Sequence, residues 1–141
     1  MKNRTILFLI ISLLSGLAVH AQTQAELTEA SRKQLKKAEL ELKTVYDQIV
    51  KDYKADNEFL RALEDSQAMW EKFRQAELKM MYPQREPFYY GSSHQMCIND
   101  YLTELTNDRI KKLSRWLTGE EEGNVCAGSV KWKEAESDRD K

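Results

Sequence analysis

The residues best suited to covalent or metal chemistry in this 141-residue chain are two cysteines and two histidines. His94 lies three residues before Cys97, a spacing that could bring an imidazole to a thiol, and Cys126 is the second cysteine. Three interpretations stay open: a Cys97–Cys126 disulfide closing a loop of about 30 residues, two structural thiols, or a nucleophilic Cys97 assisted by His94. These residues are too few for a Cys/His metal site, so we expect neither a metal nor a cofactor.

Acid–base catalysis would require carboxylates that are shielded from water and differ in pKa. The chain has 23 Asp and Glu residues, but they lie between the apolar positions of helical segments, on faces predicted to be solvated. No nucleophile elbow and no phosphate-binding glycine loop is present in the sequence. We therefore expect a protein that is not an enzyme.

Four aromatic residues are concentrated in the nine positions from Tyr82 to Tyr90, next to a flexible Gly-Ser-Ser segment. Exposed Tyr, Phe and Arg side chains are typical of protein interfaces, and binding groups tend to lie on loops held by a rigid scaffold. Either this segment contacts a protein partner, or its aromatic rings cap the end of the fold with Phe88 turned inward. The predicted partner-binding residues are Tyr82, Arg85, Phe88, Tyr89, Tyr90, Ser92 and Ser93.

Three amphipathic helical segments must position this loop. The first is predicted to begin at the capping box Thr23-Gln24-Ala25-Glu26 and to bury a stripe from Leu27 to Tyr53. The second follows an N-cap near Asp56 and ends near Met81, because Pro83 disfavours helical geometry at the residue before it. The third begins near Ser92 or Ser93 and ends at Gly119.

Composition and periodicity together predict the fold class. With 41% apolar and 32% charged residues but only five glycines and two prolines, the chain is too apolar for general disorder and too poor in turn residues for a β-sandwich. We predict an all-α, three-helix, up-down antiparallel bundle with a polar, partly disordered C-terminal tail. A long coiled-coil dimer is the alternative. The predicted interior aromatics are Tyr46, Trp70, Phe73, Tyr101 and Trp116.

The first 21 residues have the pattern of a secretory signal peptide. Lys2 and Arg4 precede an apolar run from Ile6 to Leu14, and Ala21 ends a small-residue cleavage site; an uncleaved anchor is the alternative. Cleavage would remove 21 of 141 residues, leaving 120 with 20 basic and 23 acidic side chains, a net charge of −3. We therefore expect export to the periplasm or beyond, no nucleic-acid binding, and no later segment that spans a membrane.

Several blocks of residues resemble a known family. The run Gln67-x-x-Trp70-x-x-Phe73-Arg74, the following Cys97 and Leu102-Thr103, and Thr106-x-x-Arg109 are similar in order and spacing to the LprI-like lysozyme-inhibitor domain of small exported bacterial helical proteins. The resemblance covers about residues 23–117 and predicts a domain at 22–119, between the signal peptide 1–21 and an acidic polar tail 120–141. The matching residues are Tyr46, Gln67, Trp70, Phe73, Arg74, Cys97, Leu102, Thr103, Thr106 and Arg109.

The matching polar residues have a structural interpretation and a functional one. Arg74 and Arg109 are expected to stack on a core ring or to pair with Glu77, Glu104 or Asp108, and ligand contact is the alternative. Gln67 and Trp70 are expected to pack between helices. The hydroxyl groups of Thr103 and Thr106 are expected to bond the preceding helical turn.

The resemblance implies an activity that the residues alone do not. It implies that the protein binds and blocks a lysozyme or a related cell-wall hydrolase by occluding its cleft. A non-catalytic envelope scaffold or adaptor, which binds another envelope protein through a helical face, is the competing interpretation. The resemblance also implies a second cysteine, which family members commonly carry where this chain has Leu78 and which would pair with the one at Cys97. Without that partner, Cys97 would be free to pair with Cys126.

Overall fold

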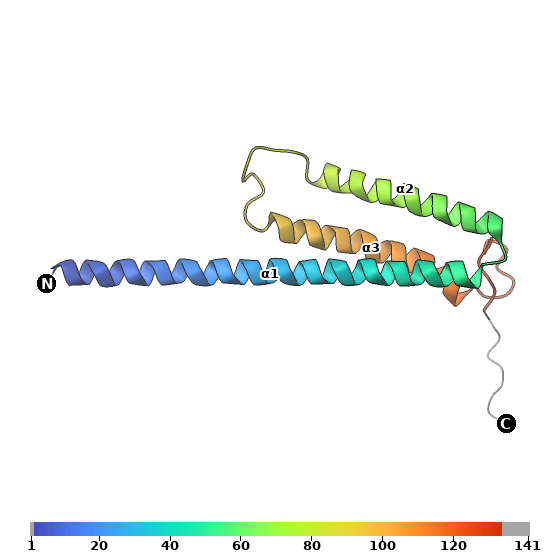
Figure 1. The fold of residues 1–141 in the computed structure, drawn as a ribbon, viewed down its shortest axis with the longest axis horizontal. Coiled ribbons are helices and arrows are strands. Elements are labelled where there is room, and N and C mark those ends of the chain that lie inside the picture. The colour runs from blue at the N-terminus through green and yellow to red at the C-terminus, as the bar shows by residue number, and fades with distance from the viewer. Residues whose placement is uncertain (1, 134–141) are drawn as a thin grey trace, which may run out of the picture.

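The computed structural model describes the backbone of residues 2–133 and the side chains of residues 23–133. It contains α1 (Lys2–Asp52), α2 (Asn57–Met81) and α3 (His94–Thr118). The three helices run up, down and up, and α2 and α3 lie alongside the C-terminal part of the much longer α1 (Figure 1). The predicted all-α, three-helix bundle is confirmed, and in the described residues only an isolated bridge between Glu120 and Trp132 has β geometry.

The helix boundaries follow local signals. Asp56 caps α2, because its Oδ1 accepts a hydrogen bond from the backbone N–H of Phe59 at 3.0 Å. As predicted, α2 ends at Met81 and α3 begins after Ser93. The start predicted at Thr23 is wrong in this structure, because α1 continues through it. No proline interrupts the helix there, and a capping box matters only where the preceding chain is not helical.

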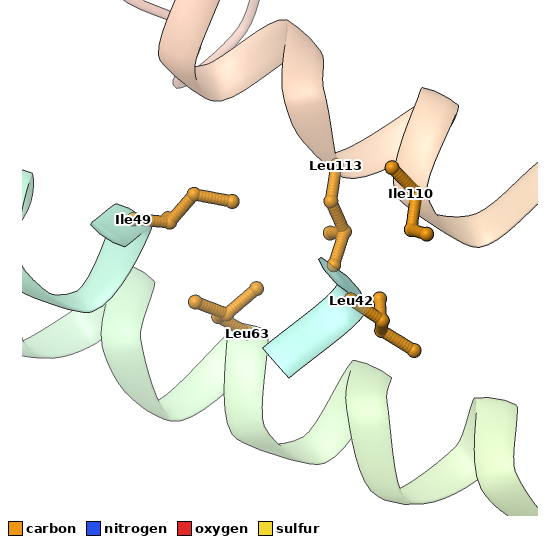
Figure 2. Close-up of a cluster of buried hydrophobic side chains, with 5 residues drawn as sticks. All are labelled: Leu42, Ile49, Leu63, Ile110 and Leu113. Atoms are coloured by element: carbon orange, nitrogen blue, oxygen red, sulfur yellow. The ribbon is translucent and has the colours of Figure 1, made fainter. Parts of the chain in front are cut away.

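The hydrophobic core joins all three helices. Leu42 and Ile49 of α1 meet Leu63 of α2 and the pair Ile110 and Leu113 of α3 (Figure 2). Aromatic side chains extend this core at one end of the bundle, with ring centroids 4.6 Å apart for Tyr53–Phe59 and 6.1 Å apart for Phe59–Trp116. This packed end fixes the helices, and the α2–α3 loop lies at the opposite end (Figure 1).

The three helices do not contribute equally to the packing. α1 packs against α3 along much of the bundle, whereas α2 approaches its neighbours closely at far fewer points. Of the predicted interior aromatics, Trp70 and Trp116 are half-buried and pack against the core, but the prediction for Phe73 is wrong because its side chain is 51% exposed. Leu27, at the start of the predicted stripe, is also exposed.

The chain after α3 returns to the packed end of the bundle. Gly119 has a φ of +77°, and a Cβ there would lie 2.9 Å from the carbonyl oxygen of Lys131, so this turn requires glycine. The hydroxyl of Tyr53 accepts a hydrogen bond from the N–H of Lys131 at 3.1 Å, and Val130 is buried. The sequence predicts that the polar tail is attached only at Cys126, Val130 and Trp132; Val130 is buried as predicted, whereas Cys126 is exposed.

Two predictions fall largely outside the described side chains. The predicted signal peptide is residues 1–21; the structure describes only the backbone of residues 2–21 of it, and it stays a prediction. The disorder predicted beyond Glu134 lies outside the described residues. Within the described residues, no helix is both long and apolar enough to cross a membrane.

The predicted disulfide is not formed. Cys97 lies in the first turn of α3 and Cys126 lies beyond its other end, and both are free thiols. More than 20 residues of helix, about 30 Å at 1.5 Å per residue, separate the two ends. A disulfide requires Cα atoms less than about 7 Å apart, so the Cys97–Cys126 prediction is wrong for this fold.

Candidate functional site

The base of the α2–α3 loop, residues 82–93, is an aromatic cluster. The ring of His94 stacks on Tyr90 with centroids 4.4 Å apart, and Tyr82 lies 5.1 Å from His94 and 5.5 Å from Tyr90. The hydroxyl of Tyr90 donates to the carbonyl oxygen of Pro83 at 2.7 Å. Tyr82, Tyr90, Ser93 and His94 are half-buried. These contacts fix the two ends of the loop to each other and to the start of α3.

The tip of the loop, in contrast to its half-buried base, is exposed to solvent. Phe88 is 95% exposed and Tyr89 is 68% exposed. Backbone hydrogen bonds from Tyr89 N–H to the Glu86 carbonyl at 3.2 Å and from Gly91 N–H to the Phe88 carbonyl at 3.0 Å form the turn. The Arg85 guanidinium lies 5.9 Å from the centroid of the Tyr89 ring. The loop therefore presents two aromatic rings and a cation to solvent on a fixed base.

The structure divides the predicted partner-binding residues into two groups. The tip holds Arg85, Phe88, Tyr89 and Ser92, which are exposed, whereas Tyr82, Tyr90 and Ser93 belong to the half-buried base. The inward orientation considered for Phe88 is wrong. Packed rings and exposed aromatic rings thus both occur in one loop, contributed by different residues.

The backbone of Phe88 is strained. Its φ of +69° is in the left-handed region, where it is the one non-glycine residue in the described part of the chain. This conformation costs a residue with a Cβ about 1–2 kcal/mol, and the exposed ring gains no burial in return. Strained residues that the fold does not need are concentrated at functional sites, so Phe88 is the strongest candidate in the loop.

Burial also affects the titration of the loop base. Burial raises the pKa of Tyr82, and the neighbouring Cys97 and Asp100 raise it further. Its phenol therefore stays neutral at physiological pH. His94 and Cys97 are both half-buried, and no hydrogen bond joins them among the described side chains. The arrangement gives no support to a nucleophilic thiol.

Arg74, from the family-like block, connects all three helices. From α2, its Nη1 donates to Thr106 Oγ1 of α3 at 3.1 Å and to Glu39 Oε1 of α1 at 3.2 Å. Its guanidinium lies 5.3 Å from the centroid of the Trp70 ring. Stacking on a core ring is confirmed, but the expected carboxylate partners are wrong. Glu77 instead accepts a hydrogen bond from the Tyr101 hydroxyl.

Arg109 is buried without a carboxylate partner. It is 7% exposed, and it donates from Nε to Gln67 Oε1 and from Nη2 to Ser66 Oγ, both at 3.1 Å. Its guanidinium lies 5.8 Å from the Trp70 ring centroid. No ion pair to Arg109 occurs among residues 23–133, and burial lowers the pKa of its guanidinium. The predicted packing roles of Gln67 and Trp70 are consistent with these contacts.

The threonines of α3 behave as their helical positions indicate. The hydroxyls of Thr103 and Thr106 donate to the carbonyls of Asn99 and Leu102, each at 2.7 Å. Leu102 is half-buried. The family-like residues therefore hold the bundle together, while the exposed tip of the loop is not engaged by the fold.

Two polar features of the structure were not predicted from the sequence. Asn99 of α3 donates to Ser31 Oγ of α1 at 3.0 Å inside the helix pair. A groove of about 710 Å³ lies between α1 and α2, with Tyr46 and Trp70 on its apolar side and Glu64 and Glu71 on α2. The repeat of acidic residues seven apart in α2 was the available signal for the groove. No group of three or more His, Cys, Asp or Glu residues is arranged to hold a metal within the described part of the chain.

The comparison with known families agrees with the motif residues. The sequence model described as "Lysozyme inhibitor LprI" matches residues 17–113, which include the motif-bearing helices and the whole α2–α3 loop. No curated protein and no solved structure matches the chain at a significant level. Because the match covers well over half of the 141 residues, the chain belongs to the lysozyme inhibitor LprI family.

Proposed function

We propose that this protein is a non-catalytic binding protein that blocks a lysozyme or a related cell-wall hydrolase. Membership of the LprI family supports binding of this kind. The observation that carries the proposal is the loop tip, where Phe88 and Tyr89 project into solvent although the fold gains nothing from their exposure. Large aromatic side chains lose few rotamers on binding and dominate the energetics of interfaces.

The geometry of the loop suits the occlusion of a concave site. The loop lies beyond the C-terminus of α2, at the end of the bundle opposite the packed aromatic end, and α1 continues past it (Figure 1). Removal of the predicted signal peptide 1–21 would shorten α1 on this side and open the loop to a cleft. The aromatic base beneath it restrains the loop before binding, which reduces the entropy lost on association. A substrate cleft filled by the tip would exclude the polysaccharide.

The predicted export places the protein where such enzymes act. With the signal peptide 1–21 removed, the protein would reach the periplasm or the cell exterior. The resulting net charge of −3 gives a mild long-range attraction to a cationic hydrolase. This attraction would accelerate encounter, while the loop would supply the specific contacts.

A double substitution of the tip tests this proposal. Protein recovered from cells that express the full chain is mixed with purified lysozymes, and both complex formation and cell-wall lysis are measured. Phe88→Ala/Tyr89→Ala should abolish inhibition. Met69→Ala/Met80→Ala, which removes two exposed apolar side chains from α2, is the matched control and should inhibit normally. If the wild type neither binds nor inhibits any lysozyme, the proposal is wrong.

An envelope adaptor is the second candidate, and one observation favours it. Met69, Phe73 and Met80 are exposed on α2 at helical spacings of four and seven residues, which puts them on one face. Such a face could pack on a helix of another envelope protein. Loss of binding in Met69→Ala/Met80→Ala, with normal binding by the loop variant, would favour the adaptor.

A further inference from the structure

The groove between α1 and α2 has an excess of negative charge. Two cations and four carboxylates line it, and both cations already form ion pairs within the chain, namely Lys43 with Asp47 and Arg74 with Glu39. The carboxylates of Glu64 and Glu71 are the two that these ion pairs leave over. Neither forms an ion pair within residues 23–133, and Glu71 accepts only a long hydrogen bond of 3.5 Å from Gln67. The groove therefore carries two uncompensated negative charges.

The two carboxylates flank a small residue on one face of α2. Glu64 and Glu71 are seven residues apart on α2, so they lie on one face about 10 Å apart along the axis. Ala68, between them on this face, contributes a side chain of one carbon and leaves the space open. A long side chain entering there would have a carboxylate on either side.

An aromatic ring faces this space from α1. Tyr46 lines the groove and is half-buried. Burial raises the pKa of Tyr46, and Glu64, Asp47 and Glu71 raise it further, which places these carboxylates within electrostatic reach of the phenol. Trp70 already has the guanidinium groups of Arg74 and Arg109 near its ring, but no described cation lies over Tyr46. Tyr46 is thus available for a cation–π contact.

We propose that the α1–α2 groove receives an arginine or lysine side chain of a basic protein partner, with its cationic group between Glu64 and Glu71 and against the Tyr46 ring. The charge complementarity identifies the occupant, because the groove offers two carboxylates without an ion-pair partner and an aromatic ring to a cationic side chain. This inference rests on the proposed function only for the identity of the partner as a basic hydrolase. The groove adds a second contact surface to the loop tip.

A charge-matched pair of variants tests the groove. Glu64→Gln/Glu71→Gln removes the two groove charges, and Glu104→Gln/Asp108→Asn removes two exposed, unpaired charges from α3. Both keep side-chain size and change the net charge equally. Binding to a basic lysozyme and to a hexa-arginine peptide is measured by calorimetry at low and physiological salt. The groove variant should bind each probe about tenfold more weakly, and the α3 variant should bind within twofold of the wild type.

A second pair tests the ring. Tyr46→Leu should weaken peptide binding several-fold, whereas Tyr46→Phe, which keeps the ring, should bind like the wild type. Circular dichroism confirms that each variant is folded, and the glutamine variants replace exposed side chains, so they stay informative if Tyr46→Leu does not fold.

The outcomes separate this inference from the proposed function. If the groove and α3 variants weakened binding equally, the groove proposal would be wrong, because net charge alone would then explain binding. Inhibition of lysozyme with unchanged affinity in the groove variant would also overturn the groove and leave the proposed function standing. Groove-dependent binding of hexa-arginine without lysozyme binding would support the groove and overturn the proposed function. If the wild type binds neither probe, both are wrong.

Discussion

Replacement of Phe88 should change stability and binding in opposite directions. The left-handed φ of +69° costs a residue with a Cβ about 1–2 kcal/mol, and asparagine tolerates this region far better. Since the ring is 95% exposed, its removal loses almost no buried apolar surface. Phe88→Asn should therefore raise the free energy of unfolding by about 1 kcal/mol and the melting temperature by roughly 4 °C.

The same substitution should weaken binding of the hydrolase. An aromatic anchor at the centre of an interface is worth about 2 kcal/mol or more, which corresponds to roughly a thirtyfold rise in Kd. Urea unfolding at constant m-value measures the first effect, and calorimetric titration with a lysozyme measures the second. Function would then be the reason for a residue that the fold does not favour.

Phe88→Ala is the matched control, because it removes the ring but keeps a Cβ in the left-handed region. Its stability should stay close to that of the wild type, while its binding should be as weak as that of Phe88→Asn. A Phe88→Asn variant that is less stable than the wild type, or no more stable than Phe88→Ala, would refute the strain argument. Tight binding by both variants would refute the proposal that the Phe88 ring anchors the interface.

Three further predictions concern the bundle. Arg109→Leu removes two hydrogen bonds that the buried, charged guanidinium donates to half-buried Gln67 and exposed Ser66, and it should lower the free energy of unfolding by about 2 kcal/mol; an unchanged urea midpoint would contradict this role. Gly119→Ala should lower the free energy of unfolding by about 2 kcal/mol and increase hydrogen exchange in residues 120–133. Unchanged protection of these residues would contradict the requirement for glycine in the turn. The hydrogen bond and charge of Arg115 hold the pKa of Glu120 below its ordinary value, so their stabilisation is present at neutral pH and is lost as the pH falls through the lowered pKa. The stability difference between the wild type and Glu120→Gln should therefore vanish in acid, and a difference that persists at pH 2 would argue against the ion pair.

The helix boundaries were predictable because each depends on a local signal. Asp56 caps α2 through its own side chain, Pro83 prevents helical geometry just after α2, and Gly119 supplies the left-handed turn after α3. The start at Thr23 was not predictable in the same way. A capping box marks the start of a helix only where the preceding chain is not helical, and α1 is already helical from Lys2.

Packing partners were harder to predict than helix faces. Periodicity placed Phe73 on an apolar face, but the exposed face of α2 also carries Met69 and Met80, so the pattern did not identify the buried side. Similarly, Arg74 was expected to pair within its own helix or with α3. Its partner, Glu39, is 35 residues away on α1, and only the crossing of the helices determines that contact.

The loop shows how far composition can indicate a site. The aromatic residues crowded between Tyr82 and Tyr90 predicted either a contact surface or a packed cap. The structure has packed rings at the base of the loop and exposed rings at its tip. The division into a packed base and an exposed tip depends on which rings meet His94, and thus on where α3 begins relative to α2. Val130, an apolar residue in a polar tail, was a predictable point of attachment, but the hydrogen bond between Lys131 and Tyr53 is a long-range contact without a local signal.

The most direct test of the central claim is an inhibition titration with a purified lysozyme and an isolated cell-wall substrate. Increasing amounts of wild-type protein should reduce the rate of lysis in a saturable manner, with an apparent one-to-one stoichiometry. The same titration with Phe88→Ala/Tyr89→Ala should leave the rate unchanged. A wild-type protein that leaves lysis unaffected at every ratio would contradict the proposed function, and equal inhibition by both proteins would contradict the role of the loop tip.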